Sequence, residues 1–529
     1  GHRFHHPGII TIGNADDYAA KLRACHVIVD PAERRDMIRA RAAELAAEAG
    51  LSVVPDEGLV AENAGLTEWP VPLLGHFDPS FLEVPREVIQ LTLRTNQKYF
   101  VLNDAEGRLA PAFICTANVT AKDGGIGIVA GNGKVLAARL SDAKFFWEQD
   151  LKVPLAEQAK KLDQIVFHEK LGTVADKVDR VAKLARWLVE QGIVVPAEVG
   201  VSGGKSGISS PEMPASAGMT REALADMAEQ AARLAKADLV TGMVGEFPEL
   251  QGIIGGYYAR AEGLPGAVAD AIRDHYKPMG QGDEVPTAPV TVAVSLADKL
   301  DSLAQFFAED MKPTGSKDPF ALRRAGLAIL ELLSINGLRL TLFGPIAFVL
   351  DRNDGVIADG IVQFLIDRLK VQQREAGVRH DLIDAVFALG GEDDLVRLLA
   401  RVKALQAFVE TPDGANLLAG YKRAANILKK EGGAPEGVSA TPDYEAEPAE
   451  SALISALDAA ESKATAAIEA EDFAAAMSAL ALLRGPIDAF FDSVTVNDPE
   501  GSKRRTRLAL LEKMRAAVHK VADFSKIEG

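Results

Sequence analysis

The chain has 529 residues, which is enough for several domains. Its 48% hydrophobic and 25% charged residues are typical of a globular protein, and no apolar run reaches the roughly 18 residues that a membrane-spanning helix needs. A net charge of −17 argues against general nucleic-acid binding. Two cysteines, Cys25 and Cys115, cannot build a disulfide framework, so we expect a reducing, cytoplasmic location.

Residues 1–154 combine helix and strand patterns and predict an α+β region. Asp30 and Pro31 suit the N-cap and the first position of a helix that Gly50 ends. Two β-rich runs flank a turn at residues 104–107 and predict a hairpin. Residues 133–151 are helical again, and the Gly-rich run before them is expected to be a turn that leads into this helix.

From residue 155 onward the pattern is almost wholly helical, so the chain is expected to be mainly α and multidomain. Residues 155–335 predict one helical domain, 336–400 a helical connector and 401–529 a last helical unit. The stretch 197–220, rich in Gly, Ser and Pro, predicts a surface insertion, and 431–448 predicts an acidic linker. Asp318 and Pro319 suit the N-cap and the first position of another helix.

Two nucleotide-binding motifs fail on inspection. In "GIVAGNGKV", Gly133 and Lys134 fit a phosphate-binding loop, but Ile128 stands where that loop has Gly and Val135 where it has Ser or Thr. The run "GGIGIVAG" lacks the strand that must precede a dinucleotide fingerprint. The residues therefore predict no nucleotide site and no catalytic residue in this chain.

Four residues follow the order of a helical metal-dependent phosphohydrolase site: His168, Asp238, His275 and Asp298. Such a site needs a His-Asp pair, but Ala237 precedes Asp238, and a methyl group cannot bind a metal. The loss of one ligand from four lowers metal affinity heavily. These residues could form an active hydrolase, or they could cap and bridge helices. We favour the second interpretation and expect no metal.

The last helical unit carries cations beside an aromatic ring and an amide. They lie in "ANLLAGYKRAANIL" and in "DPEGSKRRTRLALL", and the candidate RNA-binding residues are Tyr421, Lys422, Arg423, Asn426, Lys503, Arg504, Arg505 and Arg507. Such groups can neutralise phosphate, stack on bases and bond to base edges. A solvated helix face is the alternative, and charge alone leaves the two open. Residues 431–462 hold eight acidic residues and no basic one, so an RNA face requires this stretch to loop away.

Long motifs in a fixed order carry a resemblance to a known family. They include "ENAGLTEWPVPLLGHFDPSFLEVPREV", "GNGKVLAARLSDAKFFWEQDL", "KADLVTGMVGEFPELQGIIGGYYA" and "KDPFALRRAGLAIL". Over nearly its full length the chain resembles the β subunit of bacterial heterotetrameric glycyl-tRNA synthetase. Its end, with "YKRAANIL" and "FFDSVTVNDPEGSKRRTRLALL", is similar to an anticodon-binding domain. The opening "GHRF" matches an internal segment of the family, so we expect an N-terminal region to be missing.

The resemblance implies a role for each part of the chain. Residues 1–154 would be a tRNA-interacting accessory region, 155–335 a degenerate HD-type domain and 401–529 the anticodon-binding domain. An α subunit, in a heterotetramer of two α and two β subunits, would hold ATP, Mg²⁺ and glycine. This chain would then have no cofactor of its own and would bind and position tRNA(Gly), with no DNA or membrane partner. An active HD-type phosphohydrolase and a purely structural scaffold are the alternatives.

Overall fold

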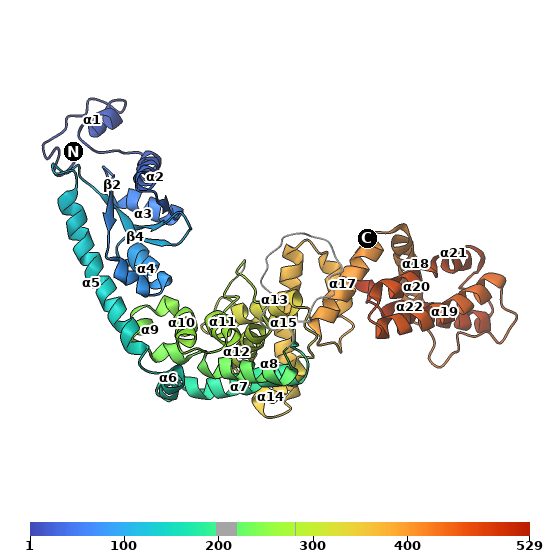
Figure 1. Ribbon diagram of the computed structural model, residues 1–529. Coiled ribbons are helices and arrows are strands. Elements are labelled where there is room, and N and C mark those ends of the chain that lie inside the picture. The colour runs from blue at the N-terminus through green and yellow to red at the C-terminus, as the bar shows by residue number, and fades with distance from the viewer. Residues whose placement is uncertain (197–218, 281, 529) are drawn as a thin grey trace. The chain divides into compact units, whose positions relative to one another are not determined.

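The computed structural model describes residues 1–196, 219–280 and 282–528 (Figure 1). The chain divides into two compact units, 1–179 with 230–275, and 180–229 with 276–529. This division runs through the predicted domain 155–335, and helices α7 (Val174–Glu190) and α8 (Arg221–Leu234) both cross it. The predicted insertion 197–220 lies outside the described residues except for its last two. The four-part domain scheme stays a prediction.

The first unit begins with a four-stranded antiparallel sheet of order β1-β3-β4-β2. The strands are β1 (Ser52–Val53), β2 (Val71–His76), β3 (Phe100–Asn103) and β4 (Leu109–Ala117). Strands β3 and β4 form the hairpin that the sequence predicts. Their connection includes Gly107 at a φ of 77°, a left-handed conformation that glycine adopts without strain.

Helices cover both faces of this sheet. Successive side chains of a strand point to opposite faces. Ala110, Ala112 and Ile114 of β4 pack with buried side chains of α2 (Pro31–Glu48) and α3 (Glu57–Leu66). On the other face the Cys115 sulfur accepts a hydrogen bond from Asn132 of α5 (Ile126–Asp150), at 3.3 Å. The long helix α5 runs beside the sheet in Figure 1.

The end of α5 is tied to the helical half of the same unit. Asp150 accepts hydrogen bonds from the backbone N–H groups of Gly242 and Met243, at 3.0 and 2.9 Å, and so caps α9 (Gly242–Glu246). The Tyr258 hydroxyl of α10 (Ile253–Ala261) donates to the same carboxylate at 2.9 Å. Further elements of this unit include α1 (Tyr18–Ala24), α4 (Arg86–Leu91), α6 (Leu155–Ala159), β5 (Val166–His168), β6 (Gly172–Thr173), η4 (Ala237–Val240) and α11 (Gly266–Asp274).

The second unit is helical and is built around α12 (Pro289–Ala308). Almost every residue of α12 is buried, as expected for a helix that is apolar all round and lies at the centre of a bundle. Helices α13 (Leu322–Ile335), α14 (Phe343–Leu350) and α15 (Gly355–Glu375) pack on it. The unit continues with α16 (His380–Phe387), α17 (Leu395–Val409), α18 (Pro412–Lys430), α19 (Pro448–Glu469), α20 (Phe473–Ala481), α21 (Arg484–Ser493) and α22 (Gly501–His519).

The mainly α fold with one small N-terminal sheet is confirmed, whereas two predicted helix starts are wrong. Helix α5 begins at Ile126, so the Gly-rich run lies inside the helix and not in a turn. Helix α13 begins at Leu322 and not at Pro319, because Ala321 has a φ of 54°. Asp318 still caps this helix, since its carboxylate accepts from the Leu322 and Arg323 N–H groups at 2.9 Å.

One stretch of the described residues, Phe473–Ser493, is long and apolar enough to span a membrane by length and composition. It comprises α20 and α21, and 44% of it is buried inside the protein. These features are those of a core segment in a helical bundle and give only weak support for a membrane span.

Candidate functional site

Three residues of the predicted hydrolase site, Ala237, Asp238 and His275, are buried in the first unit. Ala237 and Asp238 open η4, and His275 follows α11 directly. All three are 0% exposed, and Lys236, which precedes Ala237, is 7% exposed. A charged group this deep needs a partner, so the contacts of Lys236, Asp238 and His275 decide what the site can do.

Asp238 caps a helix. One carboxylate oxygen, Oδ2, accepts hydrogen bonds from the N–H groups of Gly252 and Gly255 at the start of α10, at 2.5 and 3.1 Å. A Cβ at Gly255 would lie 3.0 Å from this oxygen, so glycine permits the close approach. Burial raises the pKa of Asp238 to about 6, although the two N–H groups and Lys236 favour its charged form. The capping interpretation of the sequence therefore fits Asp238.

Lys236 occupies the imidazole nitrogen of His275 that a metal ion would need. Its ammonium lies 2.8 Å from His275 Nε2, while His275 Nδ1 lies 2.8 Å from the Ile272 carbonyl oxygen. The carbonyl can only accept, so Nδ1 carries the proton and Nε2 accepts from Lys236. A metal ion could bind Nε2 only after displacing a buried ammonium. The sequence prediction overlooked Lys236.

The remaining two hydrolase candidates do not complete a metal site. His168 lies on β5, is half-buried, and its Nδ1 accepts from the Lys170 N–H at 3.2 Å. Asp298 lies on α12 in the second unit and is 9% exposed. Within residues 1–196, 219–280 and 282–528, no three His, Cys, Asp or Glu side chains gather as metal ligands. The expectation that the chain binds no metal stays a prediction.

The eight candidate RNA-binding residues fall into three groups by exposure. They lie on α18 and α22, which pack against each other in the second unit. Arg423, Asn426, Arg504 and Arg505 are exposed, Lys422 and Lys503 are half-buried, and Tyr421 and Arg507 are buried. The first four are therefore the ones that a nucleic acid can reach directly.

Glu431 joins the two helices at this surface. It follows the last residue of α18, and its carboxylate accepts from Asn497, at 2.8 Å, and from Arg504 of α22. The hydrogen bond from Arg504 lowers the pKa of Glu431, and the bond from Asn497 adds to this effect. Arg423 is held against α21, with its guanidinium 4.4 Å from the centre of the Phe491 ring. Glu431 thus joins Arg504 of α22 to the end of α18, the helix on which Arg423 is exposed.

Arg507 has to be removed from the RNA-binding set. Its side chain is 1% exposed, and its guanidinium donates to the Thr495 carbonyl oxygen at 2.8 Å. It also pairs with Asp498 at 3.0 Å, Glu447 at 2.7 Å and Glu450 at 3.5 Å. The guanidinium is thus enclosed by carboxylates and cannot present its charge to a phosphate. It stabilises the packing of α22 on the segment 447–450.

Tyr421 is a core residue of α18. It is 2% exposed, and its ring lies 5.8 Å from that of His519 and 5.7 Å from that of Phe524. The hydroxyl lies 2.8 Å from His519 Nε2. No face of the ring is open for a base to stack on, so the predicted base-reading role is corrected for Tyr421. Asn426 keeps that role as a prediction because it is exposed.

The acidic stretch 431–462 does not loop away from α22, as an RNA face was expected to require. Its carboxylates instead pair along the helix. Glu431 binds Arg504, Glu447 and Glu450 bind Arg507, Asp458 binds Lys513 and Glu461 binds Lys520. The expectation is wrong because the basic residues of α22 are the partners of these acids. The cationic face is therefore smaller than the sequence predicts.

Two polar residues missed by the sequence prediction, Glu431 and Asn497, belong to this surface. Asn497 stands in "TVNDPEG", directly before the helix that carries Arg504. Glu431 directly follows the "KK" that ends the basic α18. Their positions at helix boundaries were visible in the sequence, but their pairing depends on how α18 and α22 pack.

Comparison with known proteins matches both parts of the chain. Residues 1–388 match the family model described as glycyl-tRNA synthetase beta subunit. Residues 417–528 match the model of the DALR anticodon binding domain. The second match contains most of α18 and all of α19 to α22, and it includes every candidate RNA-binding residue.

Curated relatives extend this match over the whole chain. The glycine–tRNA ligase beta subunit of Rhodospirillum centenum is 50% identical over all of this chain and 72% of the relative. The proteins of the same name from Phenylobacterium zucineum and Paracoccus denitrificans are each 48% identical over all of this chain, and over 74% and 73% of their own lengths. The chain therefore belongs to the glycyl-tRNA synthetase beta subunit family.

Proposed function

We propose that this chain binds and positions tRNA(Gly) for glycylation, together with an α subunit that holds ATP, Mg²⁺ and glycine. The observation that carries the proposal is the surface of α18 and α22. Arg423, Asn426, Arg504 and Arg505 are exposed there, within the region that matches an anticodon-binding domain. Cations and an amide on one surface suit RNA phosphates and unstacked bases.

The chemistry of the complex divides between its subunits in this proposal. Glycine and ATP form glycyl-adenylate with release of pyrophosphate, and the glycyl group then passes to the terminal hydroxyl of tRNA with release of AMP. This chain supplies affinity and orientation, because holding the tRNA end beside the adenylate makes the transfer effectively intramolecular. Its sequence contains neither a phosphate-binding loop nor a dinucleotide fingerprint, so ATP is assigned to the α subunit.

The assembly that we propose contains two α and two β subunits, works in the cytoplasm, and has no DNA or membrane partner. The two cysteines, Cys25 and Cys115, are free and buried, which fits a reducing compartment. An active phosphohydrolase gains no support, because Lys236 occupies the imidazole nitrogen that a metal would use.

Reconstitution tests the proposal directly. The chain mixed with a glycyl-tRNA synthetase α subunit should charge tRNA(Gly) with glycine, and neither protein alone should do so. The chain alone should not catalyse ATP–pyrophosphate exchange. Exchange by the isolated chain would place the adenylate site here and overturn the division of labour. Phosphoesterase activity with a stoichiometric transition metal would instead support the hydrolase.

A further inference from the structure

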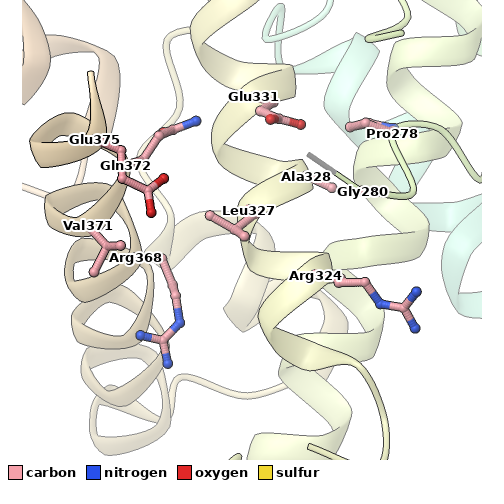
Figure 2. A pocket seen from close by; sticks show the side chains of 10 residues that line it. All are labelled: Pro278, Gly280, Arg324, Leu327, Ala328, Glu331, Arg368, Val371, Gln372 and Glu375. Atoms are coloured by element: carbon pink, nitrogen blue, oxygen red, sulfur yellow. The ribbon is translucent and has the colours of Figure 1, made fainter. Parts of the chain in front are cut away.

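A groove in the second unit lies between α13 and α15 and has a volume of about 230 Å³ (Figure 2). Leu327 and Val371 supply apolar side chains to its walls. Arg324 and Arg368 lie at one end in the view, and Glu331 and Glu375 at the other. The groove is therefore apolar in the middle and carries opposite charges at its two ends.

The two helices place these side chains by the same spacing. On α13 the order is Arg324, Leu327, Glu331, and on α15 it is Arg368, Val371, Glu375. Positions i, i+3 and i+7 lie on one face of a helix, so each helix turns an arginine, an apolar residue and a glutamate toward the groove. Arginine and glutamate on one helix are about 10 Å apart along its axis.

Three of these charges have no partner within the part of the chain that the structure describes. Among the residues that the structure describes, Arg324, Arg368 and Glu331 have no hydrogen-bond or ion-pair partner for their charged groups. The Arg368 guanidinium lies 4.8 Å from the centre of the Phe364 ring. Burial and the nearby Asp283 raise the pKa of Glu331. These three charged groups are therefore available to pair with a partner molecule.

The charges along the groove are also arranged against the dipoles of the helices that carry them. A helix favours acidic groups at its start and basic groups at its end. Arg324 instead stands in the first turn of α13, and Glu375 is the last residue of α15. Neither arrangement helps its own helix, so helix stability does not explain why the charges lie this way round.

We infer that this groove is a docking site for a protein segment of the α subunit, in which an acidic side chain, an apolar stretch and a basic side chain follow one another. Charge complementarity fixes this order, because the acidic group meets Arg324 and Arg368 while the basic group meets Glu331 and Glu375. Two carboxylates at one end disfavour an RNA strand. The inference rests on the proposed function, which supplies the α subunit as partner.

The size of the groove sets its role in such an interface. Its two charged ends are about 10 Å apart, which is the length of roughly two helical turns. A stable interface buries about 1,200–2,000 Å² in total, so the groove is one anchor within a larger contact. A central pocket that a partner side chain fills is the kind of place where binding free energy concentrates.

A polarity swap tests the docking site. The test variant keeps the amino-acid composition and the net charge and reverses four charges: Arg324→Glu, Arg368→Glu, Glu331→Arg and Glu375→Arg. Its charges lie in the direction that the helices favour, so it should fold. It should bind the α subunit at least tenfold more weakly, by sedimentation or calorimetry, with unchanged affinity for tRNA. The control swap, Lys403→Glu with Glu469→Lys, exchanges two exposed charges on α17 and α19 and should bind like the parent.

The outcomes separate the docking site from the proposed function. Parental affinity in the swapped protein would overturn the docking site alone. Loss of tRNA affinity with retained α binding would make the groove an RNA site and would also overturn it. If the unaltered chain fails to bind the α subunit, the proposed pairing falls and the docking site falls with it.

A fluorescent label gives a second, independent readout. Both native cysteines are buried, so Val371→Cys can be labelled selectively with a polarity-sensitive dye. Addition of the α subunit should shift its emission to the blue. The same dye at Val356→Cys, an exposed position on the same helix outside the groove, should not respond. An equal response at both positions, or none at Val371, would contradict the docking site.

Discussion

At the scale of single residues, buried charge is the reason why we expect no metal at the central site. The Lys236 ammonium, bonded to His275, brings a positive charge into the interior beside Asp238. One oxygen of the Asp238 carboxylate accepts hydrogen bonds from the N–H groups at the start of α10. A metal could bind His275 Nε2 only after Lys236 had left it, whereas the second Asp238 oxygen, Oδ1, has no hydrogen-bond partner among the described residues.

The raised pKa of Asp238 predicts a dependence of stability on pH. Its folded-state pKa is about 6 against an ordinary 3.8, so between these values the folded chain holds a proton that the unfolded chain has lost. The free energy of unfolding should therefore fall by about 2 kcal/mol as pH rises from about 4 to about 6, and by about 3 kcal/mol over the whole transition. Asp238→Asn keeps an acceptor for α10 and does not titrate. Urea unfolding of both proteins at pH 4, 5, 6 and 7 should show this fall in the parent and not in the variant, and equal slopes would contradict it.

Arg507 and Arg505 lie two positions apart and should respond differently to truncation. Arg507→Ala leaves Glu450, which is 0% exposed, without its cation, and should lower the free energy of unfolding by about 3 to 5 kcal/mol. Arg505 is exposed, and Arg505→Ala should change stability by less than about 0.5 kcal/mol. Chemical denaturation measures both. Similar losses in the two variants would show that Arg507 is not the centre of a buried ion cluster.

Burial of Arg507 and Tyr421 was foreseeable from the helical period, although their residue types pointed to RNA. Arg507 is in step with Leu511, Met514 and Val518, and these four residues line the buried face of α22. Tyr421 is in step with Leu417, Ala424 and Leu428 on the buried face of α18. The carboxylates around Arg507 were not foreseeable, because Glu447 and Glu450 reach it only through the packing of α19 on α22.

At the scale of elements, we expect the acidic segment before α19 to compete with RNA for the cations of α22. Glu431 holds Arg504 and Asn497, so a phosphate that approaches Arg504 must first displace or tolerate this carboxylate. Glu431→Gln keeps a hydrogen-bond acceptor and removes the charge. It should raise the affinity for tRNA(Gly) by about two- to fivefold at low salt, with less effect at high salt.

The matched control for this change is Glu469→Gln, an exposed carboxylate on α19 with no ion pair among the described residues. Both variants gain one unit of net charge, so a general electrostatic effect would raise their affinities equally. Filter binding or fluorescence anisotropy across a salt series distinguishes the two cases. Weaker binding by Glu431→Gln would show that Glu431 orients Arg504 for RNA and does not compete with it.

Capping and turn residues in the sequence predicted the presence of helices better than the residues at which they begin. Asp30 caps α2, with its carboxylate accepting from the Ala32 N–H at 2.8 Å, and Pro31 opens the helix as expected. The same Asp-Pro signal stands before α13, but Ala321 adopts a left-handed conformation and the helix begins about one turn later. No side chain in this stretch predicts that conformation. At α5 the glycines predicted a turn, yet the helix runs through Gly127, Gly131 and Gly133.

At the scale of the whole molecule, the order of long motifs predicted the family, whereas contacts between distant segments were not predictable. The two compact units each combine two separate stretches of sequence. Such a division depends on which helices pack together, and apolar periodicity shows that a helix is buried without showing its neighbour. The groove between α13 and α15 was not predictable for the same reason, since it forms only where these two helices lie side by side.

The net charge of −17 makes tRNA binding a local exception on an acidic protein. Each cation that meets a phosphate releases counterions, so losing one such contact should reduce the slope of log affinity against log salt by roughly 0.7 to 0.9. Arg423→Ala and Arg504→Ala should each show this reduction together with weaker binding. Asn426→Ala should weaken binding at an unchanged slope and should alter the preference between anticodons, because an amide reads base edges without neutralising phosphate. Arg507→Ala does not belong to this series, since its loss acts through stability. If Arg423→Ala, Arg504→Ala and Asn426→Ala all bind tRNA(Gly) like the parent at every salt concentration, the surface of α18 and α22 does not hold the anticodon.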